Sequence, residues 1–473
     1  MQSTVTLPYW VFILLAVFAA VMVLDHFLLP SMRWYMRRRV NRVIDEINTR
    51  LDIEIRPFQL TKRQALIDRL VFDEKVIDAI RLAAKEKAMP TAVAQDKARK
   101  YAGEIVPAFN AYMYFRIGYW LSKRLAKLVY RVRVGFFDKG HLRRIDPDSS
   151  IVFVMNHRSN MDYVLVSFLV AEKTTLSYAV GEWARIWPLQ TLIKSMGAFF
   201  VRRNSGNPLY RRVLERYVNM STRAGVCQAV FLEGGLSRDG ALRDPRLGFL
   251  DYMLRDYHAD IDRDITFIPV GINYDRVIED RSLIRKLDRN ATRRSKWFIL
   301  KTSLRFISKT LMLSRQHRWN RFGYASVNFG RPVSARAWCE HGEIDFSKLQ
   351  PEARFEHIGR LAQQLMDEIR NVIPVLPVAL MSEILLANSG RWSSALELKT
   401  AALRRIEELK QMGAPIRIPS NTCEAVLGNA LDALEGRCVV ECRDGLYRMD
   451  AHSSEMLGYY ANSIAHWHHI NSQ

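Results

Sequence analysis

A histidine and an aspartate five residues apart, His157 and Asp162, directly follow a short apolar run at residues 151–155. On one continuous helix this spacing would separate the two side chains by about 140°. They can meet only if His157 lies in a loop and Asp162 in the first turn of a following helix, with Ser159 or Asn160 as the N-cap. The carboxylate would then orient the imidazole while the ring takes a proton from an alcohol. Alone, the pair is more typical of a structural histidine beside an aspartate, so both interpretations stay open.

Two adjacent arginines, Arg202 and Arg203, follow a second apolar run that starts at Gly197 and includes Phe200. Guanidinium groups are forked donors that suit a phosphate. In a chain with 70 Lys and Arg, the same pair is also typical of surface charge.

The third segment, residues 231–238, ends an apolar run with a carboxylate and two glycines. Glycines after a strand let backbone amides approach a ligand. A carboxylate at the end of an apolar strand is costly unless it is paired or functional. The candidate residues of this segment are Glu233, Gly234, Gly235, Ser237 and Arg238. A fourth segment holds Pro269, which we expect to end ladder pairing and to shape a wall of the pocket.

Each of the four segments stands at the end of an apolar run or in the loop after it. These runs predict strands at residues 151–155, 176–180, 228–232, 265–270 and 325–329. Their near-continuous apolar character suits strands buried on both faces. Residues 161–171 are apolar but too short to cross a membrane, which predicts a buried helix. The predicted fold is α/β, with a central, mostly parallel sheet flanked by helices, and sites in such folds gather at strand ends.

The regions on either side of this predicted sheet have helical periodicity. We therefore expect a helical N-terminal region at residues 31–140, the α/β domain at 141–340 and a mostly helical C-terminal region at 341–473. Residues 112–134 interleave aromatic and aliphatic side chains with Lys and Arg. This pattern predicts an amphipathic helix, either packed on the next domain or lying at a membrane interface.

The first 30 residues predict a transmembrane anchor. Residues 7–24 contain no charged side chain, and apolar character returns at 27–29, which is long enough to span a bilayer. No basic residue precedes this stretch, as a cleaved signal peptide would require, whereas five arginines follow it between residues 33 and 42. By the positive-inside rule, we expect a single-pass protein of the cell (inner) membrane with its catalytic domain on the cytoplasmic side.

The net charge of +21 indicates a polyanionic partner. Residues 281–320 hold twelve Lys or Arg and one Asp, which beside an anchor suits anionic membrane lipids or an acidic carrier protein; a solvated basic face is the alternative. A nucleic-acid partner is not expected, because no binding motif accompanies the charge.

Five cysteines without a CxxC pair indicate reduced thiols. No metal is expected, since His157 has no Cys or His at ligand spacing, and no P-loop occurs.

In order and spacing, the four segments resemble the motifs of the glycerolipid acyltransferases: HxxxxD, a GxxFxRR-like block, an FxEGxxSR-like block and a proline-containing strand. The paired arginines and the long third block, which runs on to Gly248, look most like the glycerol-3-phosphate 1-O-acyltransferase branch. Residues 326–332 and 458–466 also resemble segments of the bacterial membrane-bound enzymes. The resemblance covers residues 100–466.

This resemblance implies roles for particular residues. His157 would be the general base for the glycerol hydroxyl and Asp162 its orienting partner, while Glu233 and Gly234 would support the oxyanion or substrate hydroxyls. Leu236 stands where the bacterial pattern usually has an arginine, so one phosphate contact would come from Arg202 or Arg238 or be missing. The implied substrate contacts are Arg158, Phe200, Arg202, Arg203, Gly235, Ser237, Arg238 and Pro269.

The implied reaction is direct transfer of a fatty acyl group, without a cofactor, from acyl-CoA or acyl-carrier protein to the sn-1 hydroxyl of glycerol 3-phosphate. The same mechanism would also serve lysophosphatidate or dihydroxyacetone phosphate as acceptor. A non-catalytic membrane scaffold that recruits acidic partners through residues 281–320 is the alternative from another functional class.

Overall fold

The computed structural model describes residues 9–10, 13, 55–136, 145–171, 174–181, 185, 189–202, 205–285, 322–418, 422–450 and 452–468. Almost all of the predicted anchor, most of the basic segment 281–320, and Arg203 lie outside these ranges. Within the described ranges, no helix combines the length and the apolar character needed to cross a membrane.

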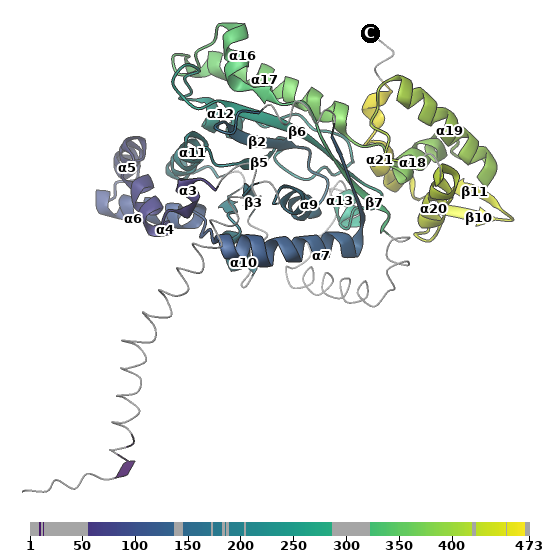
Figure 1. Ribbon diagram of the computed structural model, residues 1–473, viewed down its shortest axis with the longest axis horizontal. Coiled ribbons are helices and arrows are strands. Elements are labelled where there is room, and N and C mark those ends of the chain that lie inside the picture. The colour runs from purple at the N-terminus through teal and green to yellow at the C-terminus, as the bar shows by residue number, and fades with distance from the viewer. Residues whose placement is uncertain are drawn as a thin grey trace, which may run out of the picture.

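An eight-stranded sheet forms the centre of the fold (Figure 1), in the order β1-β7-β6-β2-β5-β3-β4, with β8 paired to β6. Pairing is parallel between β1 and β7, between β2 and both β5 and β6, and between β3 and both β4 and β5. Only the pairs of β6 with β7 and β8 are antiparallel. The strands are β1 (Arg131–Phe136), β2 (Ser150–Met155), β3 (Ser177–Gly181), β4 (Phe199–Val201), β5 (Gln228–Phe231), β6 (Ile265–Tyr274), β7 (Tyr324–Phe329) and β8 (Val333–Ser334). The mostly parallel sheet expected from the sequence is therefore confirmed.

The five strands predicted from apolar runs are all present. Four of them begin and end within one residue of the prediction, and β6 begins where predicted but ends four residues later. Alternate residues of β2 enter different core clusters on the two faces of the sheet: Ile151 and Phe153 lie in one, and Val152 and Val154 in the other. Burial on both faces explains why these strands have continuous apolar sequences.

The prediction that Pro269 ends ladder pairing is wrong. Strand β6 continues past it to Tyr274, and Pro269 itself pairs with Val154 of β2. On the other side of β6, pairing with β8 stops at Phe267 and pairing with β7 starts at Val270. Pro269 therefore falls where the neighbouring strand changes, a position at which its missing N–H is tolerated.

The helical stretch predicted at residues 112–134 ends earlier than expected. It consists of a π-helical segment, η2 (Met113–Gly118), that runs directly into α7 (Tyr119–Val129), after which the chain turns into β1. Strand β1 reads Arg-Val-Arg-Val, a period of two that is typical of an edge strand. The central sheet thus includes a strand from the region that we assigned to helices.

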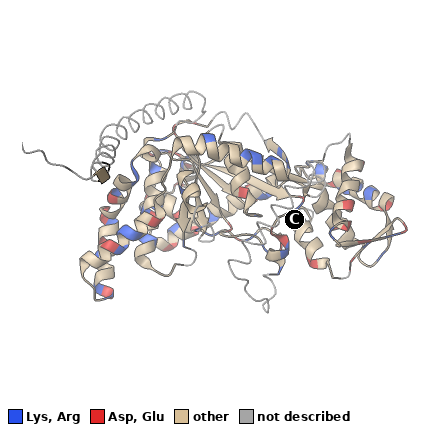
Figure 2. Ribbon diagram, turned by 90° about the horizontal axis from the view of Figure 1, so that it is seen from below, with Lys and Arg blue, Asp and Glu red and all other residues tan. Residues whose placement is uncertain are grey.

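Helices cover both faces of the sheet (Figure 1). One face is covered by α3 (Pro57–Leu60), α4 (Arg63–Val71), α5 (Glu74–Glu86), α6 (Thr91–Ile105), α11 (Pro208–Arg223), α12 (Gly248–Leu254), α16 (Ala335–Gly342) and α17 (Pro351–Val372). The other face is covered by α7, α9 (Met161–Val170) and α13 (Asp280–Ile284), while α10 (Leu189–Ser195) lies beside η2. Charged residues lie mainly on these helices and not in the strands of the sheet (Figure 2).

The C-terminal region forms one end of the molecule (Figure 1) and packs onto the core of the sheet. Its helices are α18 (Pro377–Ala387), α19 (Ala395–Gln411), α20 (Cys423–Glu435), α21 (Ser454–Ala461) and the short η5 (Ala465–Trp467). It is mostly helical, as predicted, but it also contains a small sheet of β9 (Ser393–Ser394), β10 (Val440–Arg443) and β11 (Leu446–Met449) that the sequence analysis missed.

Candidate active site

The loop between β2 and α9 brings His157 and Asp162 together. His157 follows the last residues of β2, and Asp162 lies in the first turn of α9, so the geometry expected from their spacing is present. The His157 Nδ1 atom lies 2.8 Å from Asp162 Oδ2, and both side chains are buried. Asn160 is the N-cap, but its side chain makes no capping hydrogen bond; Ser159 Oγ instead accepts from the N–H of Met161 at 3.1 Å.

The Asp162 carboxylate is fixed by further donors from the loop and from β6. Its Oδ2 atom also accepts from the backbone N–H groups of Arg158 (2.8 Å) and Ser159 (3.0 Å), and its Oδ1 accepts from the hydroxyl of Tyr274 (2.6 Å). These bonds hold the carboxylate in place, so it can fix one orientation of the imidazole. Tyr274 was not predicted from the sequence, because its contact depends on how far β6 extends past Pro269.

Aromatic rings hold the imidazole of His157 from two sides. It stacks on Phe231 at the end of β5, with ring centroids 3.8 Å apart, and meets Tyr163 of α9 edge to face at 5.6 Å. Its second nitrogen, Nε2, makes no hydrogen bond to any described residue. With Nδ1 turned to Asp162, Nε2 is the atom that is able to accept a proton from a substrate.

Glu233 fixes the backbone on which His157 sits. Its Oε1 accepts from the N–H of His157 at 2.7 Å, and its Oε2 accepts from the N–H of Arg243 at 3.2 Å. Burial raises the pKa of this carboxyl to about 7, although both hydrogen bonds act in the opposite direction. The carboxylate predicted to support substrate is thus directed at the protein backbone and joins the first and third motifs.

Ser237 also holds the third motif against the first. Its N–H donates to the carbonyl oxygen of His157 at 3.0 Å. Its hydroxyl donates to the carbonyl oxygen of Ala241 at 2.8 Å and accepts from the N–H of Gly240 at 3.0 Å. The side chain is buried within its own loop, which gives it a role in the shape of the site.

A second carboxylate, Glu279, was missed by the sequence analysis. It precedes α13, and it accepts from the hydroxyl of Ser159 at 2.7 Å and from the side-chain amide of Asn160 at 3.0 Å. Burial raises its pKa. Glu279 could have been found from the sequence by its position shortly after a predicted strand, because the predicted site residues share that position.

The arginine motif lies in a different environment from the one we expected. Arg202 forms an ion pair with Glu104 of α6, with a closest N–O distance of 2.7 Å, and its guanidinium lies 5.1 Å from the rings of Tyr101 and Tyr210. Phe200 is fully buried in β4. A carboxylate of the protein thus already pairs with Arg202, and Arg203 lies outside the described residues.

Three other arginines are better placed to meet an anion. Arg238, Arg243 and Arg246 lie on the loop that follows Glu233 and Gly234, and all three are exposed. None of their guanidinium groups makes a hydrogen bond or an ion pair with a described residue. Gly234 has a left-handed conformation (φ 67°), and a Cβ atom at this position would lie 2.8 Å from the Arg246 side chain. The loop therefore offers three free cations beside exposed backbone.

Arg158 connects the HxxxxD loop to the C-terminal helix α21. It is buried, its Nη1 donates to the carbonyl oxygen of Gly240, and its guanidinium lies 4.8 Å from the ring of Tyr459. Its Nε and Nη2 atoms have no partner among the described residues. Asn462, just beyond α21, donates to the carbonyl oxygen of Asp239 at 2.9 Å. The C-terminal region thus contacts the loops of two motifs.

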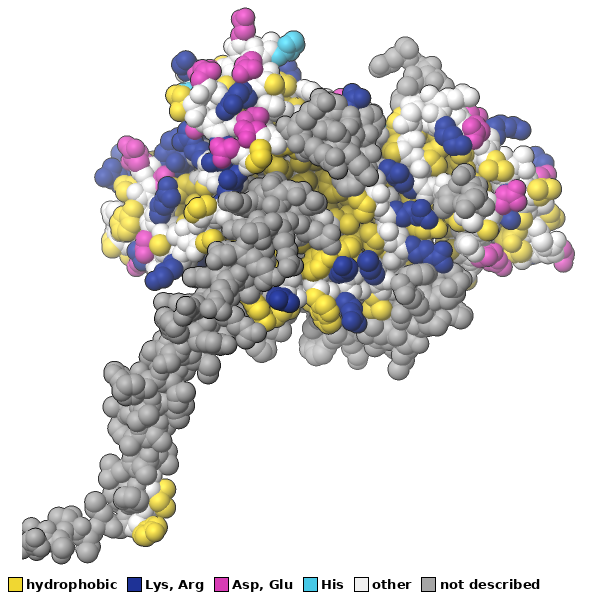
Figure 3. Space-filling view, in the orientation of Figure 1, with side chains coloured by type: hydrophobic (Ala, Val, Ile, Leu, Met, Phe, Trp, Pro, Cys, Tyr) yellow, Lys and Arg dark blue, Asp and Glu magenta, His cyan; other side chains and the backbone are white. Residues whose placement is uncertain are grey.

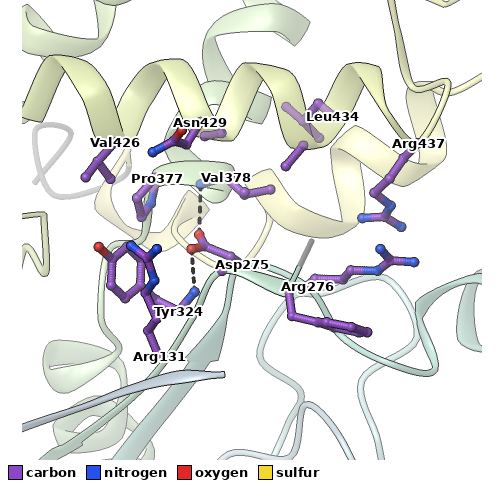
Figure 4. A pocket seen from close by; sticks show the side chains of 14 residues that line it. Arg131, Asp275, Arg276, Tyr324, Pro377, Val378, Val426, Asn429, Leu434 and Arg437 are labelled. Carbon is purple, nitrogen blue, oxygen red and sulfur yellow. Dashed lines mark hydrogen bonds between the residues drawn. The ribbon is translucent and has the colours of Figure 1, made fainter. Parts of the chain in front are cut away.

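A separate pocket lies where the sheet meets α18 and α20 (Figure 4), and none of the predicted site residues lines it. At its base Asp275 accepts from the N–H groups of Tyr324 (2.8 Å) and Val378 (3.0 Å), and burial raises the pKa of this carboxyl to about 6. The pocket belongs to the seam between the α/β and C-terminal regions. In the described part of the chain, no cluster of His, Cys, Asp and Glu could hold a metal ion.

Two family profiles match the chain. Residues 137–273 match the family described as Acyltransferase, and residues 307–472 match the glycerol-3-phosphate acyltransferase C-terminal region. Among solved structures, the 1-acyl-sn-glycerophosphate acyltransferase of Thermotoga maritima aligns with 53% of this chain and 79% of its own. It does so at 17% identity and a TM-score of 0.28, a likeness too low to support an argument.

Curated relatives match most of the chain. The glycerol-3-phosphate acyltransferase of Haemophilus ducreyi is 28% identical over 86% of this chain and 50% of its own, and that of Aeromonas hydrophila subsp. hydrophila has the same values. That of Pseudomonas aeruginosa strain UCBPP-PA14 is 27% identical over 91% of this chain and 51% of its own. The chain thus spans about half the length of the curated relatives that it matches. The resemblance inferred from the four motifs is confirmed: over most of its length the chain is similar to curated glycerol-3-phosphate acyltransferases.

Proposed function

We propose that the chain transfers a fatty acyl group from the thioester of acyl-CoA or acyl-carrier protein to the sn-1 hydroxyl of glycerol 3-phosphate, the first acylation in phospholipid synthesis. The single observation that carries the proposal is the buried contact of His157 with Asp162, which leaves one imidazole nitrogen for substrate. The motif order and the curated relatives support the choice of acceptor.

The proposed chemistry needs one base and no cofactor. His157 Nε2 takes the proton of the hydroxyl as its oxygen attacks the thioester carbon, and Asp162 stabilises the imidazolium that forms. Collapse of the tetrahedral intermediate forms the ester and expels the thiolate, which takes the proton back from the imidazolium. Backbone N–H groups near Gly234 and Gly235 are the candidate donors to the oxyanion.

We assign the phosphate of the acceptor to the loop of Arg238, Arg243 and Arg246. Their exposure and their lack of protein partners favour them over Arg202, which Glu104 neutralises. Multiple charge-assisted bonds to the phosphate would also position the hydroxyl near His157. In this assignment, the three arginines of the loop replace the arginine that the bacterial pattern usually has at the position of Leu236.

The test of the base uses the full chain reconstituted in phospholipid vesicles, with labelled acyl-CoA. His157→Ala should lose acyl transfer by at least about 100-fold, the range of a general base. The exposed His452, changed to Ala, serves as the control and should keep the parent rate. Full activity of His157→Ala would refute the assignment of the base, whereas absence of acyl transfer in the parent chain would favour the non-catalytic scaffold.

The test of the acceptor compares glycerol 3-phosphate, lysophosphatidate and dihydroxyacetone phosphate in the same assay. We expect the highest kcat/KM with glycerol 3-phosphate. Arg238→Ala should raise the KM for this acceptor more than it lowers kcat, because the guanidinium binds the phosphate and not the reacting atoms. Arg391→Ala, an exposed arginine of the C-terminal region, is the matched control. A preference for either other acceptor would reassign the substrate.

We also propose a position for the enzyme in the cell: anchored in the cell membrane through residues 1–30, with its active site on the cytoplasmic side. The uncharged stretch at residues 7–24 and the five arginines that follow it support this proposal.

A further inference from the structure

Between Gly118 and Ala126, the fully buried positions of the continuous helix formed by η2 and α7 carry small side chains, while several large apolar side chains are exposed. Gly118, Ser122 and Ala126 are buried, whereas Ile117, Trp120 and Leu121 are 40%, 53% and 41% exposed. A helix that only covers a core turns its large apolar side chains inward. In this helix Tyr119 and Leu125 do pack against the core, but Ile117, Trp120 and Leu121 are left exposed.

The buried face explains how the orientation of the helix is fixed. A Cβ atom on Gly118 would lie 2.9 Å from the end of the Met196 side chain, so the backbone approaches its neighbours closely. The buried hydroxyl of Tyr114 accepts from the N–H of Leu176, just before β3, at 3.0 Å. Rotation of the helix to bury Trp120 would break these contacts, so its exposed face is a property of the fold.

The exposed apolar side chains stand among basic ones. Residues 105–137 contain six Lys or Arg and no Asp or Glu. Arg116, Arg124 and Lys127 are exposed, and the Arg124 guanidinium lies 5.0 Å from the Trp120 ring. Figure 3 shows yellow and dark blue side chains together along the lower edge of the molecule, where α7 runs in Figure 1. Tryptophan and tyrosine with basic neighbours are typical of the interface between a bilayer and water.

The neighbouring helix also exposes an apolar side chain. Helix α10 lies beside η2 and has no buried residue, and its Leu189 is 39% exposed. Tyr112, directly before η2, is 43% exposed. Exposed apolar side chains thus occur on both of these neighbouring helices, and exposed apolar surface of this kind marks contact surfaces.

We propose that this face, formed by Tyr112, Ile117, Trp120, Leu121 and Leu189 with Arg116, Arg124 and Lys127, lies on the surface of an anionic bilayer. The apolar side chains would enter the headgroup layer, and the three cations would pair with lipid phosphates. Charge complementarity identifies the occupant, because the segment carries positive charge alone and anionic lipids give the surface a negative potential. The inference concerns contact with lipid, so it does not depend on the proposed reaction.

The experiment measures the depth of one side chain in the full chain, because an anchor alone would hold any variant on vesicles. The non-buried cysteines Cys423, Cys438 and Cys442 are replaced by Ser. An environment-sensitive fluorophore is then attached at Trp120→Cys, or at the control position Leu396→Cys, which is 75% exposed on α19. Vesicles contain phosphatidylcholine with increasing phosphatidylglycerol, and the quenchers are aqueous iodide and a nitroxide-labelled lipid.

We expect iodide to quench the fluorophore several-fold less at position 120 than at position 396, and the nitroxide lipid to quench it strongly at position 120. Protection of position 120 from iodide should increase with the phosphatidylglycerol content of the vesicles. Charge reversal by Arg124→Glu with Lys127→Glu should weaken this protection. The matched control is charge reversal at two exposed arginines, Arg391→Glu with Arg404→Glu, which should leave this protection unchanged.

Two results would overturn the proposal. The first is equal iodide quenching at positions 120 and 396 in anionic vesicles. The second is protection of position 120 by an acidic acyl-carrier protein without vesicles, which would make this face a protein-docking surface. The same labelling is repeated in the His157→Ala chain, which is expected to be inactive. If the label at position 120 is still protected from iodide there, contact with the membrane holds independently of the proposed acyl transfer.

Discussion

At the scale of single residues, the candidate site centres on the buried contact between His157 and Asp162. A strand followed by a short loop and a helix allows one arrangement in which the two side chains meet, and the structure has it. The spacing could not predict Tyr274 or Glu279. Their contacts join residues more than a hundred positions apart, and such contacts depend on strand register and loop course, which local sequence does not determine.

Tyr274→Phe tests the bond between β6 and the Asp162 carboxylate. The variant leaves a buried oxygen without one donor, which costs about 1–3 kcal/mol of stability. We expect about a tenfold lower kcat with little change in KM, because the carboxylate orients the base less well. Steady-state kinetics measure both constants.

Tyr130→Phe is the matched control for this variant. Tyr130 is also buried, its ring lies 5.2 Å from that of Tyr274, and its hydroxyl donates to the backbone of Arg276. It should lose similar stability and keep its kcat. If both variants lose kcat equally, the effect of Tyr274 is general loosening of the core.

Glu233→Gln tests how a buried carboxyl contributes to stability. The pKa of Glu233 is raised by burial from 4.5 to about 7, so the folded protein favours the protonated form. The stabilising contribution of the Glu233 carboxyl to the folded state is fully present at low pH and is lost as the pH rises through about 7. Relative to the parent, the variant should therefore gain about 3 kcal/mol of unfolding free energy between about pH 4 and 8. Chemical unfolding at several pH values measures this gain, and a constant difference would contradict the expected ionisation.

At the scale of elements, apolar runs predicted five strands and the buried helix α9 because these elements lie in the middle of the core. Strand β1 was missed because it lies at the edge of the sheet, where alternate residues carry charge and the preceding helix runs directly into it. The small sheet of the C-terminal region was missed for a similar reason. Its strands have at most four residues and are mostly half-buried, so their sequences carry little signal.

Arg437→Met tests the packing of the C-terminal elements on α13. Arg437 donates to Asp280, which also accepts from the hydroxyl of Tyr460 at 2.6 Å, and all three residues are buried. The variant leaves Asp280 without its buried cation, which costs about 3–5 kcal/mol. Arg360→Met breaks an exposed ion pair with Glu356 and should cost less than about 1 kcal/mol. Equal shifts of the thermal midpoint in the two variants would exclude a structural role for the buried pair.

At the scale of the whole molecule, the C-terminal region forms part of the environment of the site. Tyr459→Leu removes the ring that lies against the Arg158 guanidinium. We expect faster amide exchange in peptides that cover residues 156–162, together with a lower kcat, since the loop is then held less firmly. Leu396→Ser, an exposed change on α19, should leave exchange in these peptides unchanged. Unaltered exchange in Tyr459→Leu would show that the loop is held without α21.

The contact between Arg158 and Tyr459 also has a consequence for the order in which the protein is made. These residues are 301 positions apart, so the ribosome adds about three hundred residues after His157 before the helix that packs on its loop exists. Domains generally fold as units during synthesis, N-terminal parts first. The nascent sheet would therefore carry the base and its aspartate on a loop that is not yet fully packed. The proposed acyl transfer would thus begin only after residues 459–462 have left the ribosome and docked.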